Sequence, residues 1–240
     1  MVTAADSGDP LPVESSVWLT ARPAAPGRRR SEAPSGLDRE RITAATVRLL
    51  DSEGLARFSM RRLAAGLGVT AMSLYWYVDT KHDLLELALD SALGELALST
   101  GAGTGPEDFQ GSEDLQGAEG RQGAEGLQGP EGLQDPVGWP GRLRVLARGY
   151  RRLLADHPWV APLTAAYPNI GPHARAFDAA LQRLFDATGL ADPARTGAHL
   201  AVSQFLHGCG GAARRAPEGD FCLALDVLIA GIEAQATATA

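Results

Sequence analysis

Residues 59–78 read SMRRLAAGLGVTAMSLYWYV, and this stretch predicts two short helices joined by a tight turn. Ser59 and Thr70 are suitable N-cap residues, one for each helix, because their hydroxyl groups can accept a hydrogen bond from the first turn. Gly68 can adopt the left-handed conformation that ends the first helix. The stretch therefore contains its own start, stop and restart signals.

The spacing of three small or apolar residues is typical of a helix-turn-helix unit. Ala64 is small enough to let the second helix approach the first, and Gly68 permits the sharp turn between them. Leu74 follows ten residues after Ala64 and should point back into a three-helix core. An ordinary hairpin of two helices inside a bundle is the alternative interpretation of the same pattern.

The charge around this unit favours a DNA-binding helix-turn-helix over an ordinary hairpin of two helices. Between Gly54 and His82 there are four basic residues and one acid, a local charge of +3. The exposed face of the second helix should carry hydroxyl and aromatic groups that can meet phosphates, base edges and thymine methyls. The basic residues are Arg57, Arg61, Arg62 and Lys81. The positions expected on the exposed face are Thr70, Ala71, Ser73, Trp76 and Tyr77.

Helical periodicity continues on both sides of the unit and predicts an all-α protein. A helix should precede it from about residue 37 to Gly54, and a long amphipathic helix, capped by Asp79 or Thr80, should follow it through Leu96. The second half has helical spacing as well, and no strand-like alternation occurs in either half. Its segments lie near 140–155, 171–188, 192–213 and 219–236.

A net charge of −7 spread over the whole chain would argue against a DNA partner, but this charge is confined to one segment. Residues 101–135 hold eight acids and one base within a six-residue repeat, whereas the rest of the chain balances at 21 bases and 21 acids. Glycine falls at every third position of part of the repeat, but one proline in those triplets opposes a collagen-like helix. We expect a disordered acidic linker at 99–137.

Residues 1–36 contain five prolines and three consecutive arginines, Arg28 to Arg30, without apolar periodicity. We expect this segment to be a disordered arm. The arginine run is either a solvated tail or an arm that contacts phosphates or a minor groove.

Residues 37–90, LDRERITAATVRLLDSEGLARFSMRRLAAGLGVTAMSLYWYVDTKHDLLELALD, resemble the N-terminal domain of the TetR family of transcriptional repressors. LYWYV followed by TKHDLL is similar to the tetracycline-repressor branch, and LRVLARGYRRLLADHPW and FCLALDVLIAGIEA resemble its C-terminal domain more loosely. The resemblance implies a three-helix DNA-binding head with a connecting helix at 37–98, and a helical ligand-binding and dimerisation bundle at 138–240.

The resemblance also implies which residues contact DNA. Met60 and Arg61 would make backbone or base contacts, and Lys81 would contact a phosphate. Thr70 and the recognition-helix positions complete the set: Ala71, Met72, Ser73, Tyr75, Trp76 and Tyr77. Since Ala71 and Met72 bring no strong hydrogen-bonding group, the operator sequence cannot be taken from the family. Tyr75 could equally be a core residue.

The resemblance also implies a pocket inside the second bundle, where a small-molecule effector would bind. A pocket for a drug-like ligand requires large apolar and aromatic groups with a few polar ones. The candidates are Trp159, Tyr167, Asn169, His173, Phe177, Phe205 and His207, for each of which an ordinary core position is the alternative. The histidines show no firm metal spacing, so the sequence assigns no metal ligands and indicates no cofactor, and it leaves open whether a metal accompanies the ligand.

We therefore expect a cytoplasmic, ligand-responsive repressor that binds a palindromic operator as a homodimer and is released by a small-molecule effector. The dimer interface would use about 195–213 and 219–236. An activator, or a DNA-binding regulator controlled by a protein partner, is the alternative. An enzyme is not expected, because the sequence has no GxSxG, phosphate-binding loop or dinucleotide fingerprint. No stretch approaches the ~18 apolar residues of a membrane span.

Overall fold

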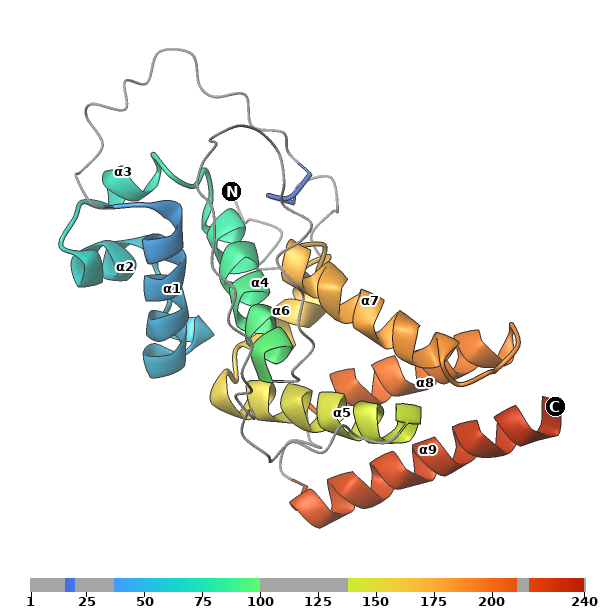
Figure 1. Ribbon diagram of the computed structural model, residues 1–240. Coiled ribbons are helices and arrows are strands. Elements are labelled where there is room, and N and C mark those ends of the chain that lie inside the picture. The colour runs from blue at the N-terminus through green and yellow to red at the C-terminus, as the bar shows by residue number, and fades with distance from the viewer. Residues whose placement is uncertain (1–15, 20–36, 100–137, 211–215, 240) are drawn as a thin grey trace, which may run out of the picture.

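The computed structural model describes residues 16–19, 37–99, 138–210 and 216–239 (Figure 1). Within these ranges the chain is helical and contains no strand, which confirms the all-α prediction. The acidic repeat and most of the N-terminal arm lie outside the described residues. None of the helices in the described ranges is long and apolar enough to cross a membrane.

The head is a small three-helix unit built around the predicted turn (Figure 1). Its elements are α1 (Arg39–Glu53), the 3-10 turn η4 (Leu55–Arg57), α2 (Met60–Leu67) and α3 (Ala71–Leu74). Leu74 is fully buried and Ala64 is 2% exposed, so α3 packs closely against α2 as the spacing predicts.

Local chemistry sets where the head helices begin and end. Ser59 Oγ accepts a hydrogen bond from Arg62 N at 3.3 Å, and Thr70 Oγ1 accepts one from Ser73 N at 3.2 Å. Gly68 has φ 68° and ψ 27°, the left-handed region in which a β-carbon is unfavourable. The predicted caps and the predicted turn glycine are confirmed.

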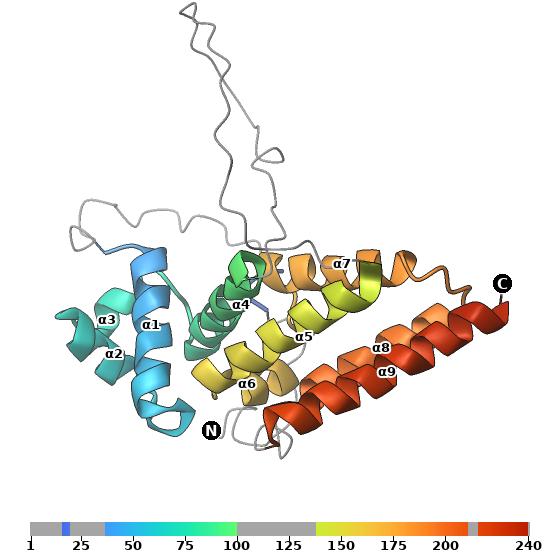
Figure 2. The ribbon, with the colours of Figure 1, turned by 60° about the horizontal axis from the view of Figure 1, so that its bottom comes forward.

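Helix α4 (Lys81–Ser99) joins the head to the body (Figures 1 and 2). Thr80 starts it through a reciprocal cap: Asp83 N donates to Thr80 Oγ1 at 3.0 Å, and Thr80 N donates to Asp83 Oδ2 at 3.3 Å. Thr80 is therefore the cap. Buried on most sides, α4 packs against α1 of the head and against several body helices.

In the ranges that the structure describes, the body is a bundle of five further helices. They are α5 (Gly138–Asp156), α6 (Val160–Ala166), α7 (Pro172–Asp186), α8 (Ala194–Gly208) and α9 (Glu218–Thr239). Helices α8 and α9 lie side by side at the end of the molecule away from the head (Figures 1 and 2). Sequence periodicity missed α6, and α8 ends at Gly208 rather than near residue 213.

Two glycines allow close contacts inside the body. Asp90 of α4 caps α7, because its Oδ1 accepts hydrogen bonds from His173 N and Ala174 N, both at 3.0 Å. A Cβ on Gly171 would lie 2.2 Å from that oxygen. A Cβ on Gly210 would lie 2.3 Å from the Cβ of Ala161, so this glycine allows a close contact with α6.

The described part of the N-terminal arm differs from the expected disordered chain. Residues 16–19 form a turn that packs against the core, and the Ser16 hydroxyl donates to Glu86 Oε2 of α4 at 2.5 Å. Burial raises the pKa of Glu86, while this hydrogen bond opposes the rise. Composition could not reveal the contact, since it depends on a buried carboxylate 70 residues away.

Candidate DNA-binding face and ligand cavity

The α3 region places most of the predicted recognition residues at the surface. Met72 is 72% exposed, Tyr75 37% and Trp76 38%, and Thr70 is also exposed. Ala71, Ser73 and Tyr77 are half-buried. The open alternatives for Tyr75 resolve to a surface position, while Leu74 alone fills the core from this helix.

The chain keeps turning beyond the last residue of α3. Tyr75 N, Trp76 N and Tyr77 N donate to the carbonyls of Met72, Ser73 and Leu74, three residues earlier in each case. The backbone of these aromatic residues therefore continues the helical turn of α3. A single short element can present hydroxyls at its start and aromatic rings at its end.

Helix α2 exposes fewer of the side chains predicted to contact DNA than the sequence led us to expect. The side chain of Met60 is 8% exposed and belongs to the core, so only its main chain could meet DNA. Arg57 and Arg61 are exposed, and no described residue forms an ion pair with either of them. Arg62 forms an ion pair with Glu53, which neutralises one of the four basic residues.

Lys81 is held beside the head by an aromatic ring. Its Nζ lies 5.6 Å from the centroid of buried Phe58, within the range of a cation–π interaction. The side chain remains exposed at the first residue of α4. An exposed cation is thus held against the core of the head.

A cavity of about 70 Å³ lies inside the body between α4 and α8. Its wall is mostly apolar, with Tyr150 and Phe177 stacked at a centroid distance of 5.5 Å. The lining residues are Leu93, Tyr150, Thr164, Asn169, Phe177, Asp178, Leu181, Ser203, Leu206 and His207. Asn169, Phe177 and His207 are thus the predicted pocket residues that reach it.

One polar group of the cavity lining, the side chain of Asn169, lacks a complete set of partners. Asn169 donates from Nδ2 to the carbonyls of Thr164 and Tyr167, but its buried Oδ1 has no hydrogen-bond partner. Burial raises the pKa of Asp178, while the nearby His199 and His207 oppose the rise. A ligand with a hydrogen-bond donor would satisfy the Asn169 acceptor.

Four predicted pocket residues do not line this cavity, because other partners hold them. Trp159 Nε1 donates to Asp51 at 2.6 Å, and the Tyr167 hydroxyl lies 2.8 Å from His82 Nδ1. His173 Nδ1 lies 2.9 Å from Asp90 Oδ2. Phe205 stacks on Phe221 at a centroid distance of 5.3 Å. These four residues are therefore absent from the wall of this cavity.

The sequence did not predict most of the residues that line this cavity. Leu93, Leu181 and Leu206 look like any core leucine, and Thr164 lies on the unpredicted α6. Tyr150 had a signal, since it is an aromatic residue on the apolar face of a predicted helix. In the described parts of the chain, no group of three or more His, Cys, Asp or Glu residues is placed to hold a metal ion.

Helices α8 and α9 leave an apolar face uncovered. Leu200, Leu223 and Val227 are 59%, 65% and 66% exposed. An apolar groove of about 380 Å³ runs between the two helices, with small residues such as Gly197 and Gly231 in its wall. Exposed leucine and valine at this density are typical of a protein–protein interface.

Comparison with known proteins agrees with this arrangement of head and body. The sequence model described as "Bacterial regulatory proteins, tetR family" matches residues 42–88, which cover the helix-turn-helix unit. The model described as "Tetracyclin repressor-like, C-terminal domain" matches residues 131–219. The chain belongs to the tetR family. This is a family of DNA-binding transcriptional regulators and not of enzymes.

Two curated relatives support the assignment to the tetR family. A helix-turn-helix-type transcriptional regulator of Saccharopolyspora erythraea is 31% identical over 193 residues, covering 80% of this chain and 65% of the relative. The transcriptional repressor DrrR1 of Streptomyces coeruleorubidus is 30% identical over 203 residues, covering 84% and 61%. The chain thus spans less than two thirds of the length of either relative.

Solved structures of tetR-family proteins share the fold. Apo ActR of Streptomyces coelicolor superposes with a TM-score of 0.62 at 22% identity, covering 87% of this chain and all of that one. ActR bound to actinorhodin gives 0.60 at 21%, covering 86% and 100%. BioQ with its double-stranded DNA operator gives 0.58 at 23%, covering 82% and 99%.

Proposed function

We propose that the protein is a transcriptional repressor that binds a near-palindromic operator as a homodimer and is released by a small-molecule effector. The observation that carries the proposal is the α3 region, where Thr70, Tyr75 and Trp76 are exposed, together with two exposed cations of the neighbouring elements, Arg61 of α2 and Lys81 of α4. A helix of this kind enters the major groove, while the surrounding cations contact phosphates.

The uncovered face of α8 and α9 supports the homodimer. Two copies of this face would bury Leu200, Leu223 and Val227 against each other in a four-helix interface. Such an interface has two-fold symmetry, so it would place two α3 elements on two half-sites of the same operator.

The cavity inside the body supports the proposal that a small-molecule effector binds to the protein. It is about 70 Å³ in this structure, whereas pockets for drug-sized ligands occupy roughly 300–1,000 Å³. The effector must therefore enlarge the cavity as it binds. Because the lining includes Leu93 of α4, an enlarged cavity would push on the helix that carries the head. A change in head separation would then weaken DNA binding, since both half-sites could not be met together.

Ser203→Phe should abolish the response of DNA binding to the effector. Ser203 lines the cavity from α8, so a phenyl ring there would fill the space that an effector needs. Because the ring needs more room than the cavity of about 70 Å³ offers, we expect it to displace α4 as an effector would, so that DNA affinity falls and added effector changes it no further. Fluorescence anisotropy with labelled DNA, titrated with compounds that release the wild type, measures both.

Ser203→Ala is the matched control, since it removes the hydroxyl without filling the cavity. It should respond to the effector like the wild type. If Ser203→Phe is released as easily as Ser203→Ala, the cavity is not the effector site.

DNA binding itself can be tested without knowing the operator. The purified full-length chain is used to select from a pool of random-sequence DNA duplexes, and the enriched sequence is called the selected DNA below. We expect a near-palindromic sequence whose complex weakens as salt rises, because phosphate contacts release counterions. Recovery of unrelated sequences in every round would contradict the proposal.

A further inference from the structure

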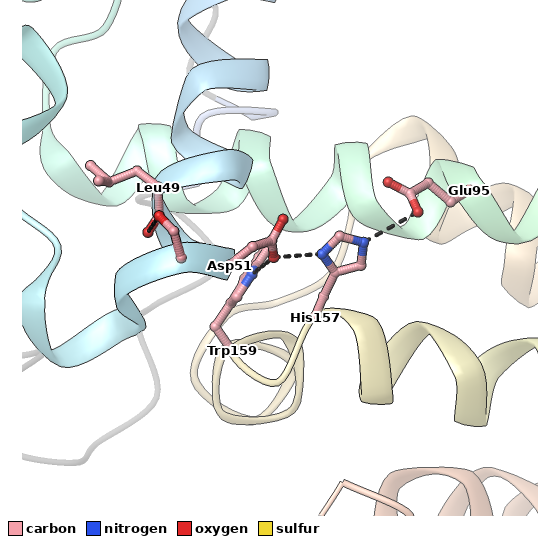
Figure 3. A network of polar contacts seen from close by, with 6 residues as sticks. Leu49, Asp51, Glu95, His157 and Trp159 are labelled. Carbon is pink, nitrogen blue, oxygen red and sulfur yellow. Dashed lines mark hydrogen bonds and ion pairs between the residues drawn. The ribbon is translucent and has the colours of Figure 1, made fainter. Parts of the chain in front are cut away.

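Four side chains from separate parts of the chain meet where the head joins the body (Figure 3). His157 Nδ1 lies 2.7 Å from Asp51 Oδ1 of α1, and His157 Nε2 lies 3.2 Å from Glu95 Oε2 of α4. Trp159 Nε1 donates to the same Asp51 oxygen at 2.6 Å. The loop between α5 and α6 thus holds a residue of the head that is 106 positions away in sequence.

The geometry requires a charged histidine. Ionised carboxylates only accept hydrogen bonds, and a neutral imidazole has a single N–H to donate. His157 can therefore bond to Asp51 and Glu95 together only as an imidazolium. Burial works to lower the pKa of His157, but the hydrogen bonds and negative charges of the two carboxylates outweigh it and raise the pKa.

Other charges near the junction do not alter this balance. Helix α6 carries no ionisable side chain in its sequence. On α5, Asp156 is paired with Arg152 at 3.6 Å. Among the described residues, Asp51 from α1 and Glu95 from α4 are the charged groups that face His157.

We propose that His157 is a positioning residue for DNA binding: held between Asp51 and Glu95, it fixes the orientation of the head on the body. The inference rests on the proposed DNA-binding function and adds a residue that touches neither DNA nor effector. A head held in one orientation loses less conformational entropy when both half-sites are bound. Releasing it should weaken DNA binding even though α3 is unchanged.

The sign of the pH dependence follows from the raised pKa. Relative to the ordinary histidine value of 6.5, such a group contributes fully at lower pH and loses its contribution as pH rises through the raised value. The junction is therefore strongest in mild acid and weakens in mild alkali. DNA affinity of the wild type should fall with pH more steeply than that of a variant without the histidine.

Anisotropy with the selected DNA between about pH 6 and pH 9, at constant ionic strength, tests the inference. We expect His157→Gln to bind about 10-fold more weakly than wild type at the acid end, with the gap closing at the alkaline end. The control is His173→Gln, which also removes a histidine–carboxylate pair, but one inside the body, with Asp90. It should follow the wild-type profile.

Two outcomes would overturn the positioning role. Equal affinity of wild type and His157→Gln at every pH means that the junction does not affect DNA binding. A deficit of constant size across the pH range means that His157 only supports the fold, without acting as an imidazolium.

A titration without DNA separates this inference from the proposed function. NMR of protein labelled at histidine Cε1 follows all five histidines, and His157→Gln assigns the signal of His157. We expect its midpoint above 6.5. Asp51→Asn should lower that midpoint while keeping an oxygen for Trp159. A midpoint at or below 6.5 overturns the inference alone, whereas failure to select any DNA overturns the proposed function on which it rests.

Discussion

Tyr75→Ala combined with Trp76→Ala is expected to weaken binding to the selected DNA by roughly 1000-fold. Both rings are exposed at the end of the recognition element, and neither fills the core. Aromatic side chains dominate many interfaces, and a homodimer would present each ring twice. A loss of about 1 kcal/mol per ring over four rings is about 4 kcal/mol, which corresponds to this factor. Anisotropy at fixed salt measures the change.

The conservative pair Tyr75→Phe and Trp76→Phe is the control, because it keeps aromatic surface at both positions. It should retain most of the affinity. Circular dichroism must show the same helical content for both double variants. If the alanine pair binds as well as the wild type while remaining folded, α3 is not the DNA-reading element.

Leu223→Glu combined with Val227→Glu is expected to produce a monomer and to reduce DNA affinity by about 100-fold or more. The two side chains stand on the uncovered face of α9, about 65% exposed in a single chain. Four buried carboxylates at a two-fold interface would cost more than the apolar contacts contribute. A monomer then binds a half-site without the gain from linkage, which is commonly 10²–10⁴-fold.

Analytical ultracentrifugation gives the mass, and anisotropy gives the affinity. Val145→Glu is the matched control, since Val145 is another exposed apolar residue, on α5, with 39% of its surface exposed. It should remain dimeric and bind DNA normally. A doubly substituted protein that still sediments as a dimer would place the interface elsewhere.

Local signals were enough to predict the head. Ser59, Gly68 and Thr70 act through hydrogen bonds and backbone angles within a few residues, so the sequence pattern alone locates them. Helix α6 escaped prediction because it has only seven residues and is flanked by prolines, too short for an apolar period to show.

The interior of the body could not be predicted in the same way. Trp159 and Tyr167 look like pocket residues because they are aromatic, but each is bonded to a partner more than 80 positions away. His157 gave no signal at all, since its meaning depends on the meeting of α1, α4 and the α5–α6 loop. Long-range pairing of polar side chains is a property of the folded chain rather than of any local pattern.

Two copies of this chain are expected to read two half-sites of one operator. Hydroxyl-radical footprinting on the selected DNA, combined with the mass of the complex, tests it most directly. We predict protection with two-fold symmetry, half-sites about one helical turn or a multiple of it apart, and an even number of chains per site. A single unsymmetrical footprint occupied by one chain, or protection that is the same on scrambled DNA, would contradict the account.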